Sequence, residues 1–251
     1  MSGHSKWASI KHQKGVADAR RGQLFTKLTR EIIVAVREGG GNPDTNFRLR
    51  LAVQKARDSN MPLDNIERAI KRGSGDLEGG TLTEMVLEGY GSGGAAILVE
   101  AVTDNRNRTL QEIRNIFSRS GGSLGESGCV AWLFEPKGLI TVETNDLVTE
   151  ELALQAIDAG ADDVTVEKDH VEIYTKTEEL ESVRATLEQN NITINSAELV
   201  NVPKTTLELE EKIALQVLKL LQKLEGLDET RSVCSNVDFP DSVLESYQEQ
   251  G

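Results

Sequence analysis

The sequence is poor in the residues from which catalytic and metal sites are usually built. Of its 251 residues, only two are cysteines, Cys129 and Cys234, and three are histidines. The cysteines stand far apart, so no cysteine–histidine spacing fits a zinc site. His4 and His12 lie near the start of the chain, and His170 lies in a turn between two expected strands, where we expect it to be exposed and structural. A nucleophile with a histidine base is therefore not expected. The sequence predicts a protein that is not an enzyme and that binds no cofactor, no metal ion and no small-molecule substrate.

Long hydrophobic runs are also missing. No segment approaches the ~18 apolar residues of a membrane-spanning helix, and no apolar stretch opens the chain as in a secretory signal. We therefore expect no membrane contact and a reducing, cytoplasmic location, in which both cysteines are small buried hydrophobes. The hydrophobic content of 38% is still enough for packed cores. The length favours about two domains, or three small ones.

Positive charge is scarce as well, except in the first part of the chain. The formal net charge is -13, which alone argues against a nucleic-acid partner. Residues 1–72, however, hold 15 Lys and Arg against 7 Asp and Glu, a net charge of +8, whereas residues 73–251 hold 13 against 34, a net charge of -21. Such asymmetry is typical of a nucleic-acid-binding region joined to another part. The acidic remainder would repel a polyanion and confine its contact to one face.

The first 14 residues form a cationic segment, called the basic arm below, that cannot build a hydrophobic core. The basic arm contains three lysines, two histidines and one tryptophan. Cations can neutralise phosphates and the indole ring can stack on a base, so this composition suits a polyanion. A solvated, frayed terminus is the alternative. The candidate nucleic-acid-binding residues of the basic arm are His4, Lys6, Trp7, Lys11, His12 and Lys14.

A helix is predicted over residues 16–38, because apolar residues recur there at helical spacing and Gly39 is a natural C-cap. A second face of this helix, away from the core, carries cations that continue the basic arm. This face either contacts phosphates or is an ordinary solvated face. The candidate nucleic-acid-binding residues of this helix are Arg20, Arg21, Lys27, Arg30 and Arg37.

Two further helices complete a predicted three-helix bundle with a basic exterior. The second helix is expected to run from Pro43, its first position, to about Ser59, with Asn42 as its N-cap. The third is expected over residues 63–72, with Leu63 among its inward-facing residues. A glycine-rich linker follows at residues 73–80, where the charge also changes sign, so this segment is the clearest domain boundary.

Alternating residues after the linker predict a hairpin over residues 84–102, with Glu88 on the face opposite to Leu87. Its glycine-rich turn leads into a strand rather than a helix, so we do not interpret it as a phosphate-binding loop. A helix is expected over residues 106–119, and residues 129–134 are expected to form a buried strand.

Asp104 or Asn105 can cap the start of this helix. Two arginines, Arg106 and Arg108, follow them in the sequence. In an otherwise acidic region these arginines are a second candidate phosphate contact. They can equally pair with the neighbouring acids, and we slightly favour that interpretation.

Residues 138–202 follow the order βαββαβ of a ferredoxin-like fold. The segment before them lacks a second helix, which the helix and strand after residue 205 can supply. We therefore predict an α+β fold: an N-terminal three-helix basic bundle followed by two α+β domains, the last one ferredoxin-like and inserted in the other. The predicted domains are residues 1–77 for the basic arm and bundle, 78–134 with 205–240 for a discontinuous α+β domain, 135–204 for the inserted acidic domain, and 241–251 for a frayed tail.

Several motifs resemble those of the YebC/PmpR family. The resemblance covers nearly the whole chain and is weakest in the inserted domain. The family often has proline where this chain has Ser92, and Ser235-Asn236 sits in a looser C-terminal motif. The matching motifs are Gly3-His4-Ser5-Lys6-Trp7, Ile10-Lys11-His12, Phe25-Thr26-Lys27-Leu28, Gly39-Gly40-Gly41, Asn60-Met61-Pro62, Glu88-Gly89-Tyr90-Gly91, Thr103-Asp104-Asn105-Arg106-Asn107-Arg108-Thr109, Gly121-Gly122, Gly128 to Phe134 and Asn236-Val237-Asp238.

This resemblance implies a three-domain cytoplasmic protein of a kind described as a probable transcriptional regulator that binds promoter DNA. Other relatives, including mitochondrial ones, resemble translation factors that act at the ribosome, some of them easing stalls at proline runs. The family has no accepted enzymatic activity. By similarity, the basic arm and the first helices would be the nucleic-acid surface.

The leading hypothesis is a non-enzymatic nucleic-acid-binding regulator of gene expression, in the first place a DNA-binding transcriptional regulator. A translation factor that binds the ribosome and its RNA, and relieves stalling, is the alternative within the same class. An adaptor whose acidic domains dock on a basic protein partner is a hypothesis of another class. An enzyme acting on nucleic acid has the least support, because nothing arranges the abundant carboxylates into a site.

Changing Lys6, Lys11 and Lys14 to Ala is expected to weaken nucleic-acid binding. The slope of log affinity against log salt should flatten by up to about three units, roughly one for each lost phosphate contact. A salt titration of duplex binding by fluorescence anisotropy measures this slope. An unchanged slope would remove the basic arm from the interface.

Overall fold

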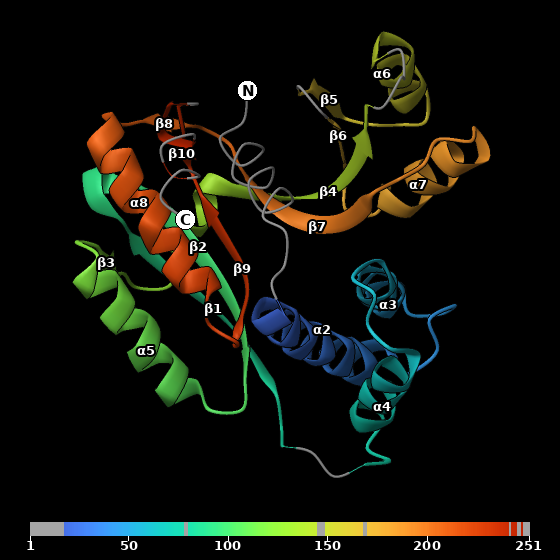
Figure 1. The fold of residues 1–251 in the computed structure, drawn as a ribbon, viewed down its shortest axis with the longest axis horizontal. Coiled ribbons are helices and arrows are strands. Elements are labelled where there is room, and N and C mark those ends of the chain that lie inside the picture. The colour runs from blue at the N-terminus through green and yellow to red at the C-terminus, as the bar shows by residue number, and fades with distance from the viewer. Residues whose placement is uncertain are drawn as a thin grey trace. The chain divides into compact units, whose positions relative to one another are not determined.

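The computed structural model describes residues 18–77, 80–144, 149–167, 170–240, 242–244 and 247, with side chains from residue 21 onward. Within these ranges the chain divides into two compact units. One is formed by residues 135–202 and the other by the residues on both sides of it. Helices come first in the chain and α+β assemblies follow, so the predicted α+β fold class is confirmed (Figure 1).

Helices α2 (Asp18–Gly39), α3 (Phe47–Asp58) and α4 (Leu63–Gly73) form the predicted bundle around one hydrophobic core. The expectation that Leu63 faces inward is wrong. Leu63 is 58% exposed, because it is the first residue of α4 and lies outside the layer that the later turns bury. The main core residues of the bundle are Leu28, Ile32, Val36, Leu49, Val53, Ala56, Ile66 and Ala69.

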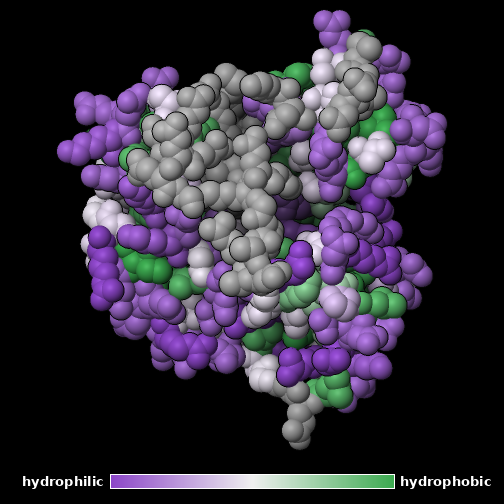
Figure 2. Space-filling model, in the orientation of Figure 1, coloured by the Kyte–Doolittle hydropathy of each residue, from purple (hydrophilic) through white to green (hydrophobic). Residues whose placement is uncertain are grey.

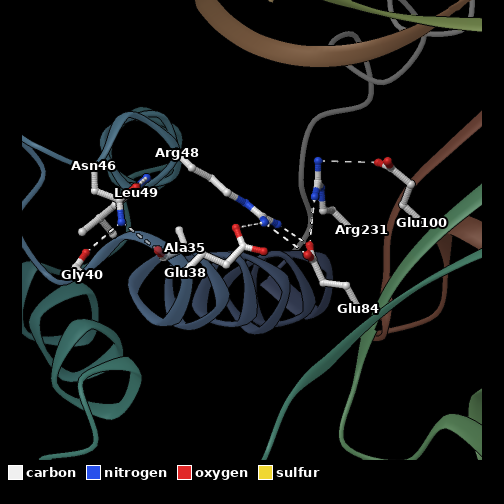
Figure 3. Close-up of polar contacts among 9 residues, drawn as sticks. All are labelled: Ala35, Glu38, Gly40, Asn46, Arg48, Leu49, Glu84, Glu100 and Arg231. Carbon is white, nitrogen blue, oxygen red and sulfur yellow. Dashed lines mark hydrogen bonds and ion pairs between the residues drawn. The ribbon is translucent and has the colours of Figure 1, made fainter.

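Helix α3 begins later than expected, and its N-cap is Asn46 rather than Asn42. The buried Asn46 side chain accepts a hydrogen bond from the Leu49 amide at 3.0 Å. Its amide group donates to the carbonyls of Ala35 at 2.7 Å and Gly40 at 2.8 Å, so one side chain ties the end of α2 to the start of α3 (Figure 3). Asn42 instead begins a turn, in which its side chain accepts from the Asp44 amide.

Asn46→Ala is expected to lower the local stability of α3 by about 2–3 kcal/mol. The substitution removes an N-cap, which typically costs about 0.5–2 kcal/mol, and takes the side-chain donor away from the carbonyls of Ala35 and Gly40, of which the first bond is buried. Hydrogen exchange of the α3 amides reports this local opening free energy. The matched substitution Asn42→Ala lies in an exposed turn and should cost about 0.5 kcal/mol or less. Equal effects of the two substitutions would contradict this assignment of the cap.

The four-stranded sheet of the larger unit joins two segments that are distant in the sequence, and this sheet with its helices is called the sheet domain below. Its strand order is β3-β1-β2-β9. Strand β1 (Thr83–Tyr90) forms the predicted hairpin with β2 (Ala96–Thr103), and β9 (Thr230–Ser235) adds to β2 in an antiparallel register. The shorter elements of this unit are two 3-10 turns (Ser92–Gly94 and Ala131–Leu133) and the strands β3 (Ser123–Leu124), β8 (Leu207–Glu208) and β10 (Val237–Asp238).

Helices α5 (Arg106–Arg119) and α8 (Glu211–Glu225) cover one face of this sheet (Figure 1). Asn105 caps α5 by accepting from the Arg108 amide at 3.1 Å, as one of the two predicted capping residues. The expectation that the last residues are frayed is wrong for two of those that the structure describes. Val243 is 3% exposed and Tyr247 is 5% exposed, and both pack into the core between the sheet and α8.

Residues 129–134 do not form the predicted buried strand. They include a 3-10 turn, and only the last of them begins a strand. The cause is Glu88, which is 5% exposed instead of facing outward on its strand. Its carboxylate accepts from the amides of Gly128 at 2.6 Å, Val130 at 2.7 Å and Ala131 at 2.7 Å. Because these amides are satisfied by the carboxylate, the loop wraps around Glu88 instead of pairing with a strand.

This arrangement has opposite effects on two titratable groups. Burial acts to raise the pKa of Glu88, but the three amide donors outweigh it, so the pKa is lowered and the carboxylate stays charged. Burial, aided by the negative charge of Glu88, raises the pKa of the nearby Cys129 thiol. Cys234 is buried as expected, whereas Cys129 is only half-buried, which corrects the prediction for that residue.

The smaller unit follows the order βαββαβ, with strand order β5-β6-β4-β7. Its first and third strands therefore lie in the middle of the sheet, and the predicted ferredoxin-like fold is confirmed. Strand β6 is antiparallel to both of its neighbours. The elements are β4 (Phe134–Glu143), α6 (Thr149–Asp158), β5 (Asp163–Val166), β6 (His170–Thr175), α7 (Leu180–Gln189) and β7 (Ser196–Pro203).

His170 is not an exposed turn residue, as the sequence suggested. It is the first residue of β6 and is 9% exposed. Because alternate residues of a strand share a face, His170 lies beside Glu172 and Tyr174. Its Nε2 lies 3.4 Å from Glu172 Oε1, and the Tyr174 hydroxyl donates to Glu172 Oε2 at 2.7 Å. Burial, with the adjacent carboxylate, raises the pKa of Tyr174, so this hydroxyl remains a donor.

Candidate nucleic-acid interface

The predicted interface divides between residues that the structure describes and residues that it does not. Residues His4, Lys6, Trp7, Lys11, His12 and Lys14 of the basic arm, and the side chain of Arg20, lie outside the described part. Arg21 is exposed on the first turns of α2. The remaining candidate residues, Lys27, Arg30, Arg37, Arg106 and Arg108, have defined surroundings.

Helix α2 makes polar contacts with the C-terminal end of α8. The Gln23 side chain donates to the Gly226 carbonyl, and Lys27 Nζ donates to the Glu225 carbonyl. The last carbonyls of a helix have no partner within the helix and carry partial negative charge, so an ammonium group is a favourable donor to them. Lys27 therefore holds the bundle against the sheet domain.

Two more cations of the predicted phosphate-binding face also contact the rest of this unit. Arg30 Nη2 lies 3.6 Å from Glu229 Oε1, in an ion pair whose side chains are 20% and 12% exposed. Arg37 is exposed, and its Nη2 donates to the Gly80 carbonyl at 3.2 Å. The face of α2 that leaves the bundle core thus meets the sheet domain and the end of the linker, and it is only in part a solvated surface.

A pocket of about 480 Å³ lies between α2 and α4. Its wall from α2 is one helical face, with residues three or four positions apart, and its wall from α4 has the same spacing. Gly80 and Leu82, which precede β1, and Asp104 in the loop before α5 also line it, as does Met61 just before α4. The lining residues are Phe25, Thr26, Thr29, Arg30, Ile33, Arg37, Met61, Asn65, Arg68, Ala69, Arg72, Gly80, Leu82 and Asp104.

The charge of this pocket is strongly positive. Among its lining residues, Arg30, Arg37, Arg68 and Arg72 are basic and Asp104 is the one acidic residue. Arg30 is incompletely satisfied: its Nη1 is buried and has no hydrogen-bond partner among the described residues. The pocket is therefore lined by four arginines, and one of them, Arg30, has a buried donor that lacks an acceptor within the described part of the chain.

The second candidate phosphate contact, at the start of α5, is occupied by acidic partners. Arg108 Nη2 lies 2.7 Å from Asp104 Oδ1 and 3.1 Å from Glu229 Oε1. The hydrogen bond to Asp104 is the main cause of the raised pKa of Arg108. For Arg108, this geometry agrees with the interpretation that it pairs with neighbouring acids. Arg106 is exposed on the first turn of α5.

A network of alternating charges joins the bundle to the sheet (Figure 3). The Arg48 guanidinium from α3 binds both Glu38 at the end of α2 and Glu84 on β1. Glu84 Oε1 also lies 3.2 Å from Arg231 Nη1 on β9, and Arg231 Nη2 lies 3.6 Å from Glu100 on β2. Burial acts to lower the pKa of Arg48, but its hydrogen bonds to the two glutamates raise it. The pKa of Glu84 is lowered, because Arg48 and Arg231 outweigh the effect of its burial.

Sequence reasoning counted the cations of α3 and α4 but did not name them as site residues. Arg68 and Arg72 are exposed and line the pocket, and Arg57 and Lys71 are exposed elsewhere on the bundle. The four-residue spacing of Arg68 and Arg72 places them on one face of α4, which is a signal that the sequence does contain. Figure 2 shows hydrophilic residues over most of the visible surface of α3 and α4, broken by separate hydrophobic patches.

In the part of the chain that the structure describes, no group of three or more His, Cys, Asp or Glu side chains could hold a metal ion. Within the same residues, no helix has the length and apolar character needed to cross a membrane.

Comparison with known proteins gives matches along almost the whole chain. Residues 5–76 match the family model of the TACO1/YebC protein N-terminal domain, and residues 82–237 match that of the TACO1/YebC second and third domain. A probable transcriptional regulatory protein of Dehalococcoides mccartyi is 60% identical over 250 residues, which is 100% of both chains. One from Moorella thermoacetica is 53% identical over 249 residues, 98% of both chains. The crystal structure of a conserved hypothetical protein from Aquifex aeolicus is similar with a TM-score of 0.86 and 49% identity, covering 92% of this chain and 96% of that chain.

Glu84→Gln removes the carboxylate charge that Arg48 and Arg231 share. We expect cleavage of the linker at residues 74–81 by subtilisin to become about two- to fivefold faster, since part-exposed ion pairs contribute about 0.5–1 kcal/mol and the bundle would separate from the sheet more often. Mass spectrometry of the fragments gives the rate. Glu67→Gln, an exposed carboxylate on α4, is the control. Equal rates in the two variants would show that the network does not hold the bundle.

Proposed function

The chain belongs to the TACO1/YebC family, and from this premise we propose that it is a non-enzymatic, nucleic-acid-binding regulator of gene expression that acts on DNA in the cytoplasm. The relatives named probable transcriptional regulatory protein support the regulatory role. The observation that carries the proposal is the charge of residues 1–72, which is +8 in a chain of net charge -13. A polyanion is attracted to this part and repelled by the rest.

The surroundings of each cation refine the proposed interface. Lys27, Arg30 and Arg48 contact the sheet domain, so we assign them to holding the bundle in place. Arg108 pairs with Asp104 and Glu229 within the sheet domain. The basic arm and the exposed cations of the bundle are then the phosphate contacts. These residues are His4, Lys6, Trp7, Lys11, His12, Lys14, Arg20 and Arg21, together with Arg37, Arg57, Arg68, Lys71 and Arg72.

We expect little preference for DNA sequence. A recognition helix reads base edges with Asn, Gln or Arg near its N-terminus. The first turn of α4 instead presents Leu63 and Asp64, and its Asn65 lines the pocket between α2 and α4. The Asn46 side chain at the start of α3 is buried in capping bonds. Phosphate contacts position a protein without specifying a sequence, so affinity should fall steeply with salt.

Binding to ribosomal RNA is the second candidate function, and the arginine-lined pocket favours it. A paired base in a duplex cannot enter a pocket, whereas an unpaired nucleotide of a structured RNA can. The acidic smaller unit, residues 135–202, has 4 Lys and Arg against 16 Asp and Glu, a net charge of -12. Such a surface suits a basic protein partner alongside either nucleic acid.

Co-sedimentation with ribosomes in the presence of excess duplex DNA separates the two candidates. If DNA is the target, the duplex should remove the protein from ribosomes at every salt concentration between about 50 and 200 mM, a range over which phosphate contacts weaken strongly. The variant with Ala at Lys6, Lys11 and Lys14 controls for binding through the basic arm. Retention of the wild-type protein on ribosomes despite the duplex would contradict DNA as the target and support the second candidate.

A further inference from the structure

We propose that the pocket between α2 and α4 binds a single nucleotide unit, with the phosphate on its arginines and the base against Phe25. This inference rests on the proposed function, since it names how the bundle takes hold of one unit of a nucleic acid. The same chemistry is offered by a free nucleoside monophosphate and by an unpaired nucleotide of a strand. The experiment below distinguishes these two sources.

The excess positive charge of the pocket favours the binding of an anion. Arg68 and Arg72 are four residues apart on α4, and like charges at this spacing repel one another. Arg30 and Arg37 approach from α2. The one carboxylate among the described lining residues, Asp104, already accepts a hydrogen bond from Arg108 at 2.7 Å. A phosphate would neutralise the excess charge, and guanidinium groups bind phosphate oxygens in a bidentate geometry.

Arg30 gives a second, independent reason. Its Nη1 is buried without an acceptor among the described residues, while Nη2 lies 3.6 Å from Glu229, beyond a good hydrogen-bond distance. An unsatisfied buried donor, above all on a charged group, is costly. An oxygen of a ligand in the pocket would supply the missing acceptor. Arg30 therefore both anchors α2 through Glu229 and, as a residue that lines the pocket, carries a buried donor that lacks an acceptor among the described residues.

The size and the uncharged wall of the pocket select a nucleotide over a bare phosphate ion. The volume of about 480 Å³ falls within the usual range of small-molecule sites, roughly 300–1,000 Å³. Phe25, Ile33, Met61 and Leu82 give it an apolar side. An aromatic ring in such a wall can stack on a base of any sequence. The amide of Asn65 adds a group that can hydrogen-bond to a base edge.

The test is isothermal titration of the full chain with adenosine 5′-monophosphate, with adenosine, and with inorganic phosphate. We expect the monophosphate to bind at least tenfold more tightly than either of the other two. Arg68→Ala with Arg72→Ala should weaken it at least tenfold. The matched control, Arg57→Ala with Lys71→Ala, removes the same charge from exposed positions that do not line the pocket, and should change it less than twofold. Equal losses in the two double variants, or no binding of the monophosphate, would overturn the proposal.

Further variants separate the pocket from folding and from the proposed function. Phe25→Leu should weaken binding of the monophosphate while leaving binding of inorganic phosphate unchanged. Equal weakening of both would contradict the contact between the base and Phe25. The variant with Ala at Lys6, Lys11 and Lys14 should lose duplex binding but keep the monophosphate. Retention of duplex binding by that variant would contradict the proposed interface and would leave the assignment of the pocket unaffected. Loss of the monophosphate in the same variant would contradict the pocket assignment.

Competition identifies the source of the nucleotide. A single-stranded hexanucleotide that displaces the monophosphate from the wild-type chain, but fails to bind the Arg68 and Arg72 double variant at the same site, supports an unpaired nucleotide of a strand. A hexanucleotide that leaves the monophosphate bound supports a free nucleotide. The duplex is tested on the variant with Ala at Lys6, Lys11 and Lys14, which should not bind it. Displacement of the monophosphate from this variant by a blunt duplex as effectively as by the single strand would overturn the pocket as the site, because a paired base cannot enter it.

Discussion

Ion pairs and charged hydrogen bonds between the bundle and the sheet domain determine which cations remain available to a ligand. Lys27 binds the carbonyl end of α8, and Arg30 shares Glu229 with Arg108. From α3, Arg48 binds Glu84 on β1. Each pair is modest when partly exposed, but several together restrict how far the bundle can move. A linker rich in glycine would by itself allow free motion.

Because some cations of the bundle contact the sheet domain, fewer of them are exposed to solvent than the sequence of the bundle contains. The inward-turned cations fix α2, and α2 in turn forms one wall of the arginine-lined pocket. The opposite wall, from α4, depends on Arg68 and Arg72, which have no such anchoring role in the described contacts. The pocket and the exposed cations therefore lie on helices that internal ion pairs hold against the sheet domain. Substitutions that break these internal ion pairs should therefore weaken ligand binding, although they change no residue that contacts the ligand.

Much of the fold could be predicted, because it depends on local periodicity. The helices of the bundle, the hairpin, the cap at Asn105 and the βαββαβ order all follow from spacing within short windows. The errors lie where a distant group overrides the local pattern. Glu88 gathers amides about forty residues away, Asn46 reaches back to α2, and His170 is buried beside Glu172. For the site, sequence reasoning identified the basic region, but it could not tell which cations pair with acids from another part of the chain.

Lysine acetylation footprinting with and without a 30-base-pair duplex tests the proposed division of cations most directly. Lys6, Lys11, Lys14 and Lys71 are predicted to become protected by the duplex. Lys27 should react poorly in both states, because its ammonium group is bound to the end of α8. Lys176 and Lys212, which are exposed in the acidic part of the chain, should react equally in both. Protection confined to Lys176 and Lys212, with the lysines of the first 72 residues unchanged, would contradict the account.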